Sequence, residues 1–426
     1  MNRISDLQKF LDNAHSVYHA VALLVEKLEN AGYKRLKEIN PWTLIPGGKY
    51  YVTRNDSAVI AFRAPTGAPK GFLISASHAD KCSFKVKENS VEVGKYTRLL
   101  VEKYGGHILS TWLDRPLSVA GRVLVETENG VETKLIDIDR DLLLIPNVAI
   151  HMNRSVNDGF KLNLAVDMIP LLGNKDSAEK FRAEVEELAG GKILGKDLFL
   201  YVRQPSTVWG ADNEFISAQT LDDLECVWGC TCGFLNAKPT DNIPVLCVFD
   251  NEETGSSSYQ GAASDFLQST LSRMCKVLNM EESSAFAQSF MVSADNGHAI
   301  HPNHPELSDS ANAPVMNGGV VIKFNANQRY TTDGLSAAIF RKICQKAGVP
   351  VQNYCNRADM AGGSTLGNIS LSQVAVPSVD IGLAQLAMHS CYETAGVQDA
   401  VYLADAMTAF YGAALTTETD GSWNIG

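Results

Sequence analysis

The chain has 426 residues, of which 45% are hydrophobic and 20% charged, and its formal net charge is −11 at pH 7. This length exceeds a typical single domain, and the composition is that of a globular protein with a large core, so we expect two domains. The negative charge disfavours binding to nucleic acid or to an acidic membrane surface, because such partners require a basic face.

Membrane and secretion signals are not found in the sequence. No stretch approaches the roughly 20 apolar residues that span a bilayer, and Met1–Lys9 lacks the apolar core of a signal peptide. Nine cysteines at irregular spacings do not form the pattern of a disulfide framework. Cys226, Cys230 and Cys232 lie close together, and we interpret them as helix packing because no second pair at metal-binding spacing accompanies them. We therefore expect a cytoplasmic protein.

Residues 1–203, about the first half of the chain, divide into two parts with different predicted secondary structure. Apolar residues at near-helical spacing predict one amphipathic helix over 6–28, and two strands follow at 59–64 and 71–77. From about Ser90 to Arg203 the chain instead holds β-like runs and one charged helix near Ala178–Ala189. The β-like runs are 117–125, 133–138 and 142–145.

From about Ser217 onward, helices and apolar strands alternate. Helices are predicted at 221–236, 265–278, 335–347 and 399–413, and strands at 243–249, 290–294, 319–324 and 374–381. This alternation predicts an α/β fold, a mostly parallel or mixed sheet with helices on both faces. We expect residues 1–89 and 206–426 to form this domain, with 90–205 as a β-rich insertion.

Residues with metal-binding side chains follow the predicted strands. His78, Glu253 and Asp295 come directly or shortly after strands, His389 follows the last strand after a short loop, and Asp222 stands at a helix start. Ligands of open α/β sheets bind outside the carboxyl ends of the strands, so we expect these five side chains to meet. Each of them alone also fits a plain surface or helix-capping role.

Together the five side chains predict a catalytic centre with two divalent cations. Imidazole and carboxylate ligands suit Zn²⁺, with Mn²⁺ and Co²⁺ as alternatives, and one carboxylate can bridge two ions roughly 3.5–4 Å apart. Asp80 suits the carboxylate that orients His78 through its far ring nitrogen. A carboxylate at Glu252 or Glu253 that does not ligate can accept a proton from metal-bound water and pass it to a leaving amine.

The sequence resembles a known family along nearly its whole length. The matching stretches include Ser77–Asp80, Leu221–Leu224, Asn251–Ser256, Ser293–Asp295, His298–Asn303, Lys323 with Gln328–Tyr330, Gly363–Gly367, Met388–Ser390 and, in the middle region, Ser110–Trp112 and Ile145–His151. They are similar to the M18 metallo-aminopeptidases, the aspartyl aminopeptidases. Departures from the family pattern are Asp223, Thr254, Pro116 and Ser118, and none of them falls on a predicted ligand.

The resemblance implies roles for each site residue. His78 and Asp295 would hold one metal ion, Glu253 and His389 the other, and Asp222 would bridge them. Glu252 would be the general base and acid. The insertion would form dimers within a tetrahedral homo-dodecamer, and His151 would reach the active site of a neighbouring subunit. A strand-end histidine with an ordinary hydrogen bond is the alternative for His151.

The resemblance also implies peptide substrates with an acidic N-terminal residue. A buried carboxylate needs a cation as partner, and Lys323 at the end of an apolar strand is our candidate, with Tyr330 and His298 as further hydrogen-bonding groups. A strand-end lysine facing water is the plain alternative. Two other functions stay open: a broader aminopeptidase or deacylase, and a catalytically silent assembly or cargo protein.

Overall fold

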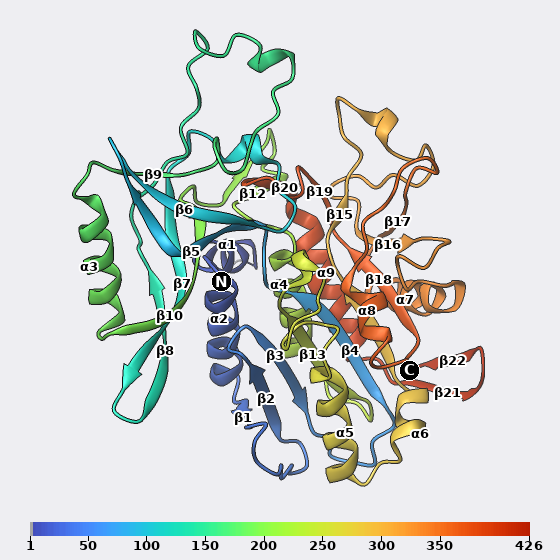
Figure 1. Ribbon diagram of the computed structural model, residues 1–426. Coiled ribbons are helices and arrows are strands. Elements are labelled where there is room, and N and C mark those ends of the chain that lie inside the picture. The colour runs from blue at the N-terminus through green and yellow to red at the C-terminus, as the bar shows by residue number, and fades with distance from the viewer. Residues whose placement is uncertain (1–2) are drawn as a thin grey trace.

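The structure, a computed structural model, describes residues 3–426 (Figure 1). Within this range the chain forms four sheets, nine α-helices and four short 3₁₀ helices. The helices are α1 (Arg3–Asn13), α2 (Val17–Asn30), α3 (Ser177–Ala189), α4 (Leu224–Asn236), α5 (Phe266–Leu278), α6 (Glu282–Ala287), α7 (Gly334–Ala347), α8 (Leu366–Leu371) and α9 (Val397–Tyr411). None of them is long and apolar enough to cross a membrane.

A nine-stranded sheet forms the centre of the molecule. In spatial order its strands are β1 (Lys34–Arg35), β2 (Lys49–Arg54), β3 (Ala58–Arg63), β13 (Ile243–Phe249), β4 (Phe72–His78), β14 (Phe290–Ala294), β18 (Ser378–Gly382), β16 (Val320–Phe324) and β17 (Val351–Cys355). The four middle strands β13, β4, β14 and β18 run parallel, so their carboxyl ends lie at one edge. The β2–β3, β3–β13 and β16–β18 pairs are antiparallel, which confirms the predicted mixed α/β sheet.

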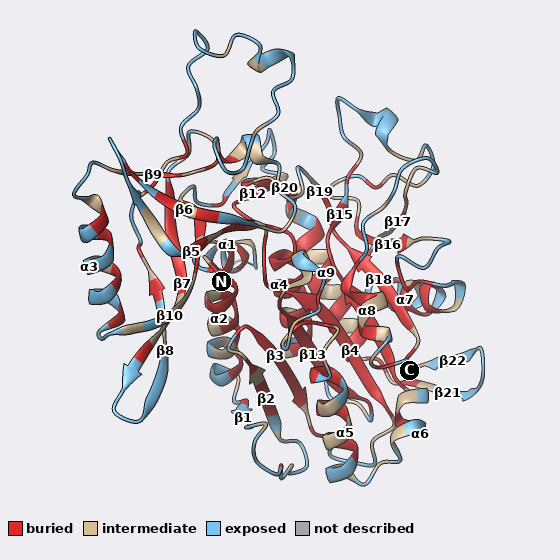
Figure 2. Cartoon of the chain, viewed as in Figure 1, coloured by how far each residue is buried: buried red, intermediate tan, exposed pale blue. Residues whose placement is uncertain are grey.

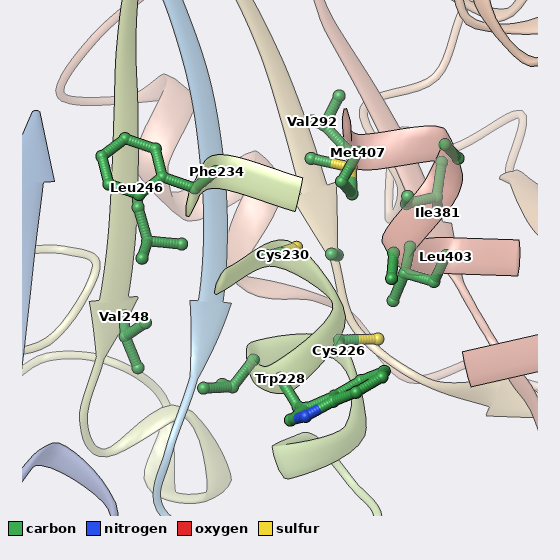
Figure 3. Close-up of a cluster of buried hydrophobic side chains, with 14 of the residues drawn as sticks. Cys226, Trp228, Cys230, Phe234, Leu246, Val248, Val292, Ile381, Leu403 and Met407 are labelled. Atoms are coloured by element: carbon green, nitrogen blue, oxygen red, sulfur yellow. The ribbon is translucent and has the colours of Figure 1, made fainter. Parts of the chain in front are cut away.

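Helices cover both faces of this sheet. One apolar cluster packs α1, α2, α4, α7 and α9 on the first face, and a second packs α5, α6 and α8 on the other. The central strands are buried almost throughout (Figure 2). Figure 3 shows side chains of α4, among them the fully buried Cys226 and Cys230, packed in the first cluster near β13 and α9. These cysteines therefore serve helix packing, as predicted.

A second, six-stranded antiparallel sheet lies beside the first, with α3 next to it (Figure 1). Its order is β8 (Gly130–Asp137), β7 (Leu117–Thr127), β10 (Ile193–Val202), β5 (Ser83–Val93), β6 (Thr97–Tyr104) and β9 (Leu171–Gly173). The predicted strand at 142–145 forms only isolated bridges, for example between Leu117 and Leu143. This sheet starts at Ser83, and we propose that the inserted domain starts there as well.

A third sheet was not predicted. Its five short strands, in order, are β11 (Thr207–Trp209), β12 (Phe215–Ala218), β20 (Glu393–Gly396), β19 (Ala384–Leu386) and β15 (Gly297–His298). It joins segments that follow β10, β14 and β18 in the chain, and so it fixes the loops beyond the carboxyl ends of the central strands. A terminal hairpin of β21 (Leu415–Thr419) and β22 (Ser422–Ile425) completes the fold.

The single helix predicted over 6–28 is wrong, because the chain breaks after Asn13 and starts again at Val17. Ser16 has extended backbone angles, and its hydroxyl accepts the N–H of His19, which makes it an N-cap. The apolar spacing is nearly in phase across the break, so periodicity alone does not reveal it.

Candidate metal centre

The carboxyl ends of three parallel strands bring the predicted ligands together. β4 ends at His78, and β14 is followed at once by Asp295. β13 is followed by a short 3₁₀ turn at Glu252–Thr254. Asp222 comes from the loop between β12 and α4, and His389 from the turn between β19 and β20. Two of the five side chains therefore lie on connections that follow strands of the unpredicted third sheet.

Two groups of potential ligands lie side by side. In the first, His78, Asp222 and Asp295 are all buried and each offers an atom within 4.8 Å of the others. In the second, Glu253 and His389 meet the thiol of Cys82 within the same limit. The sequence did not predict that Cys82 lies here, because a single cysteine before a strand forms no recognisable pattern.

Asp222 stands between the two groups. One of its oxygens, Oδ1, is 3.6 Å from Nε2 of His78, and the other, Oδ2, is 3.6 Å from Nε2 of His389. Nε2 of His389 is also 3.4 Å from Oε2 of Glu253. The carboxylate therefore faces each group with a separate oxygen, which is the arrangement of a bridging ligand.

These residues fit divalent cations. Oδ1 of Asp222 is buried and has no hydrogen-bond partner among the described residues, an expensive state for a carboxylate oxygen. Burial raises the pKa of Glu253 to about 7, with help from the charge of Asp222, and burial raises the pKa of Asp295 to about 6. Several buried acids in one place repel each other unless cations neutralise them. The mixture of imidazole and carboxylate groups is that of a zinc site.

Glu252 differs from Glu253 in its surroundings. Its Oε2 is 4.0 Å from Nε2 of His78, and its side chain lines a cavity of about 210 Å³ next to both groups. Burial, together with the charges of Asp295 and Glu253, raises the pKa of Glu252 to about 8, although His78 opposes the shift. A carboxyl group with a pKa near neutrality can both accept and return a proton.

Asp80 makes more contacts than an orienting carboxylate needs. Its backbone carbonyl is 3.1 Å from Nδ1 of His78, and its Oδ1 is 3.3 Å from the same atom. The carboxylate also accepts the backbone N–H groups of Glu252 and Glu253 and the hydroxyl of Tyr104. One side chain thus connects the ends of β4 and β13 with β6 of the inserted sheet.

Two further buried carboxylates fix the backbone of the site. Glu393 accepts the N–H groups of Leu221 and Asp222 at Oε2 and that of His389 at Oε1. Asp223 is fully buried and accepts the N–H groups of His78 and Asn296, so it does not face solvent. The sequence did not predict a role for Glu393, because its partners are backbone groups, which leave no pattern in the sequence.

The cavity beside Glu252 contains the three predicted substrate-binding side chains Lys323, Tyr330 and His298. Lys323 is buried; its Nζ donates to the carbonyl of Asn296 at 3.0 Å and lies 3.9 Å from Oδ1 of Asp295. Burial alone would lower the pKa of Lys323, but the charge of Asp295 raises it above its ordinary value. The cavity therefore has a charged ammonium group in its wall, and the water-facing alternative for Lys323 is excluded.

His151 does not lie at this site. It is exposed in a turn of the long loop between β8 and β9, and no described contact joins it to the metal centre of its own chain. Several apolar neighbours in this loop are also exposed, namely Val148, Ile150, Met152, Phe160, Leu164 and Val166.

Comparison with known proteins decides the family. The sequence profile of the aminopeptidase I zinc metalloproteases (M18) matches residues 10–411. The chain belongs to the M18 family. A probable M18 family aminopeptidase 2 from Clostridium acetobutylicum is 43% identical over 418 residues, which cover 94% of this chain and 96% of the relative. Another from Pseudomonas aeruginosa is 39% identical over 418 residues, with 94% and 96% covered.

Solved structures agree with this assignment. A chain of the cryo-EM structure of the Ape4 and Nbr1 complex superposes with a TM-score of 0.92 at 34% identity, over 96% of this chain and 85% of that chain. The S. cerevisiae mApe1 dodecamer superposes with a TM-score of 0.85 at 25% identity, with 96% of each chain covered. The protein is thus a zinc metallo-aminopeptidase by family, with the family's fold.

Proposed function

We propose that this M18 protein removes N-terminal residues from peptides with a dinuclear metal centre. His78 and Asp295 would hold one ion and Glu253 and His389 the other, with Asp222 between them. The observation that carries this proposal is the placement of the two Asp222 oxygens, one toward each histidine at 3.6 Å. Zn²⁺ is our first assignment for both ions, and Mn²⁺ and Co²⁺ suit most of the same ligands.

When bound, such a pair of ions polarises the scissile carbonyl and acidifies a water molecule. The remaining work falls to Glu252, which we assign as general base and acid. Its carboxylate accepts the proton of the attacking water and later delivers it to the leaving amine. Asp80 positions this step, because its carboxylate holds the backbone of Glu252 and also orients His78.

We further propose a preference for N-terminal Asp or Glu. The ammonium group of Lys323 is the cation in the cavity wall, and its Nζ lies 5.4 Å from the ring centre of Tyr330. A substrate carboxylate buried there would gain a charge-assisted hydrogen bond. Tyr330 and His298 would supply further polar contacts in the same cavity.

We also propose that the protein forms a homo-oligomer, a tetrahedral dodecamer in which the inserted domain makes the dimer contacts. Exposed apolar side chains around His151 support contacts between copies, because isolated soluble chains seldom expose such a cluster. His151 would then enter a neighbouring active site. We also place the enzyme in the cytoplasm, because all nine thiols are free of disulfides.

Substitution of Glu252 by Gln tests the catalytic assignment. The amide keeps the size of the side chain but cannot take up the proton, so we expect turnover to fall by about 10²–10⁴-fold. Zinc content and unfolding temperature should stay at the wild-type level. Glu214→Gln is the control: Glu214 is half-buried on the loop before β12, and its carboxylate accepts the N–H of Asp212 outside the metal centre. Near-normal turnover of the Glu252 variant would rule out the assigned role.

A substrate panel tests the specificity. Peptides that start with Asp, Glu or Leu, and one with an acylated N-terminus, are compared on the zinc-reconstituted protein. Equal cleavage of Asp and Leu peptides would indicate a broader aminopeptidase, and cleavage of the acylated substrate a deacylase. A zinc-loaded oligomer without any hydrolysis would indicate the silent assembly protein. Loss of activity with a chelator and its return with Zn²⁺ would support the metal-dependent reaction.

A further inference from the structure

Tyr104, the last residue of β6, reaches from the six-stranded sheet to the turn that carries Glu252 and Glu253. Its hydroxyl donates to Oδ2 of Asp80 at 2.7 Å and accepts Nδ2 of Asn251 at 2.8 Å. An ionised carboxylate can only accept and an amide nitrogen can only donate, so both directions are fixed. The hydroxyl therefore joins the segment that follows β4 to the segment that follows β13.

Both partners of this hydroxyl hold the turn. Asp80 accepts the backbone N–H of Glu252 at Oδ1, at 3.1 Å, and that of Glu253 at Oδ2, at 3.2 Å. Asn251 has a φ of +62° and is the residue from which the 3₁₀ turn starts. The hydroxyl is thus linked to the turn at two points, and a shift of either point would move the carboxylates of Glu252 and Glu253.

Hydrogen bonds carry much of the support for the back of this turn. Asp80, Asn251 and Tyr104 line a cavity of about 210 Å³, whose other walls come from α2, β5, β7 and β10 and are mostly polar. Gln260, in the same wall, donates to Oδ1 of Asn251 at 2.8 Å. Because a cavity lies here instead of close-packed side chains, the turn depends on these polar contacts for its position.

The six-stranded sheet fixes the tyrosine itself. Tyr104 pairs with Ser83 in the β5–β6 ladder, and its ring packs edge-on against Phe199 of β10 with the ring centres 5.5 Å apart. Removal of the hydroxyl alone leaves both contacts in place, so such a variant keeps its ring where it was. The sheet therefore sets the position of the ring, and the hydroxyl passes this position on to the turn.

We propose that Tyr104 is a positioning residue for the general base Glu252, through which the inserted sheet takes part in the catalytic step of its own subunit. The inference rests on the proposed function, because it requires that Glu252 moves the proton. The substrate-binding side chains Lys323, Tyr330 and His298 line the other cavity, the one beside Glu252. Loss of the hydroxyl should therefore lower kcat and leave KM unchanged, since a misplaced base slows proton transfer without removing a substrate contact.

Tyr104→Phe in the zinc-loaded, full-length protein tests this role, with Tyr201→Phe as the matched control. Tyr201 lies on β10 of the same sheet, and its hydroxyl donates to Oδ1 of Asp137 at 2.8 Å. Asp137 pairs with His15 in the connection between α1 and α2, so this hydroxyl supports a different contact of the inserted sheet. Both variants lose one hydroxyl–carboxylate hydrogen bond, and their unfolding midpoints in urea should fall by similar amounts.

The kinetic constants for a peptide with N-terminal Asp, measured at saturating zinc, distinguish the two variants. Tyr104→Phe should lower kcat by about 10–100-fold, the loss that outer partners of a metal site typically cause, with KM unchanged. Tyr201→Phe should keep both constants. Wild-type kcat in Tyr104→Phe, or equal losses of kcat in the two variants, would overturn the proposal and leave Glu252 as the general base.

A double variant separates positioning of the base from a general loosening of the site. If Tyr104 acts through Glu252, then Tyr104→Phe should leave the residual kcat of Glu252→Gln nearly unchanged, because the two side chains serve one step. A further loss as large as in the wild-type background would mean that the hydroxyl acts elsewhere, and the proposal would fall. Near-normal turnover of Glu252→Gln alone would instead remove the proposed catalytic assignment, and the role of Tyr104 with it.

Discussion

Substitution of Glu393 by Gln tests whether buried backbone contacts hold the metal ligands in place. The carboxylate accepts three N–H groups, two at Oε2 from Leu221 and Asp222 and one at Oε1 from His389. An amide has one acceptor oxygen, so its NH₂ group must face either the pair or His389. At least one buried N–H group then loses its partner, which costs about 1–3 kcal/mol.

Because the displaced backbone carries Asp222 or His389, we also expect zinc affinity to fall by roughly 10–100-fold. Zinc affinity is measured by chelator competition and stability by denaturant unfolding. Asp399→Asn is the matched control: Asp399 is equally buried and accepts the N–H groups of Asn317 and Gly319, outside the metal centre. The control should lose similar stability and keep its zinc affinity. Wild-type zinc affinity in the Glu393 variant would refute the reasoning.

Three further predictions concern packing, pH and specificity. Gly233→Ala should destabilise the protein by about 1–3 kcal/mol, because the new Cβ would lie 2.4 Å from Cβ of Met407. Denaturant unfolding measures this loss. Gly334→Ala is the control and should be near neutral, because nothing lies within 4 Å of its new Cβ. Burial lowers the pKa of His19 from 6.5 to about 4. The neutral imidazole therefore contributes its full stabilisation above pH 6.5, and this contribution to the free energy of unfolding is lost as the pH falls to 4. Unfolding of wild type and His19→Gln at pH 7 and pH 4 should therefore show roughly 3 kcal/mol more loss in wild type, and equal losses would contradict the buried-histidine argument. Lys323→Met should lower kcat/KM for N-terminal Asp relative to Leu by about 10–100-fold, the value of a charge-assisted hydrogen bond, and an unchanged ratio would remove Lys323 as the selecting residue.

The sequence could predict the α/β core because its strands are long and apolar. It could also predict that His78, Glu253 and Asp295 meet, since parallel strands place their carboxyl ends at one edge. The structure brings these side chains together with Asp222 and His389. Their assignment as ligands stays a prediction until metal binding is measured.

The rest of the site escaped prediction for physical reasons. The third sheet has strands of two to four residues, too short for a periodic signal. Glu393 and Asp223 act on backbone N–H groups, which every residue carries, so no side-chain pattern marks their partners. Cys82 needs both the approach of Gly105 and the turn of Glu253 to become part of a cluster, and these contacts exist only in the folded chain.

The wide spacing of the ligating residues along the chain has a consequence for protein synthesis. Because synthesis begins at the N-terminus, His78 leaves the ribosome more than 300 residues before His389 and its hydrogen-bond partner Glu393. A growing chain can therefore pair β2 with β3 before a complete metal centre exists, whereas β4 has its sheet partners only after β13 and β14 are made. On the proposed assignment, a chain acquires hydrolytic activity only after residue 393 has been synthesised, so shorter nascent chains cannot degrade the peptides around them.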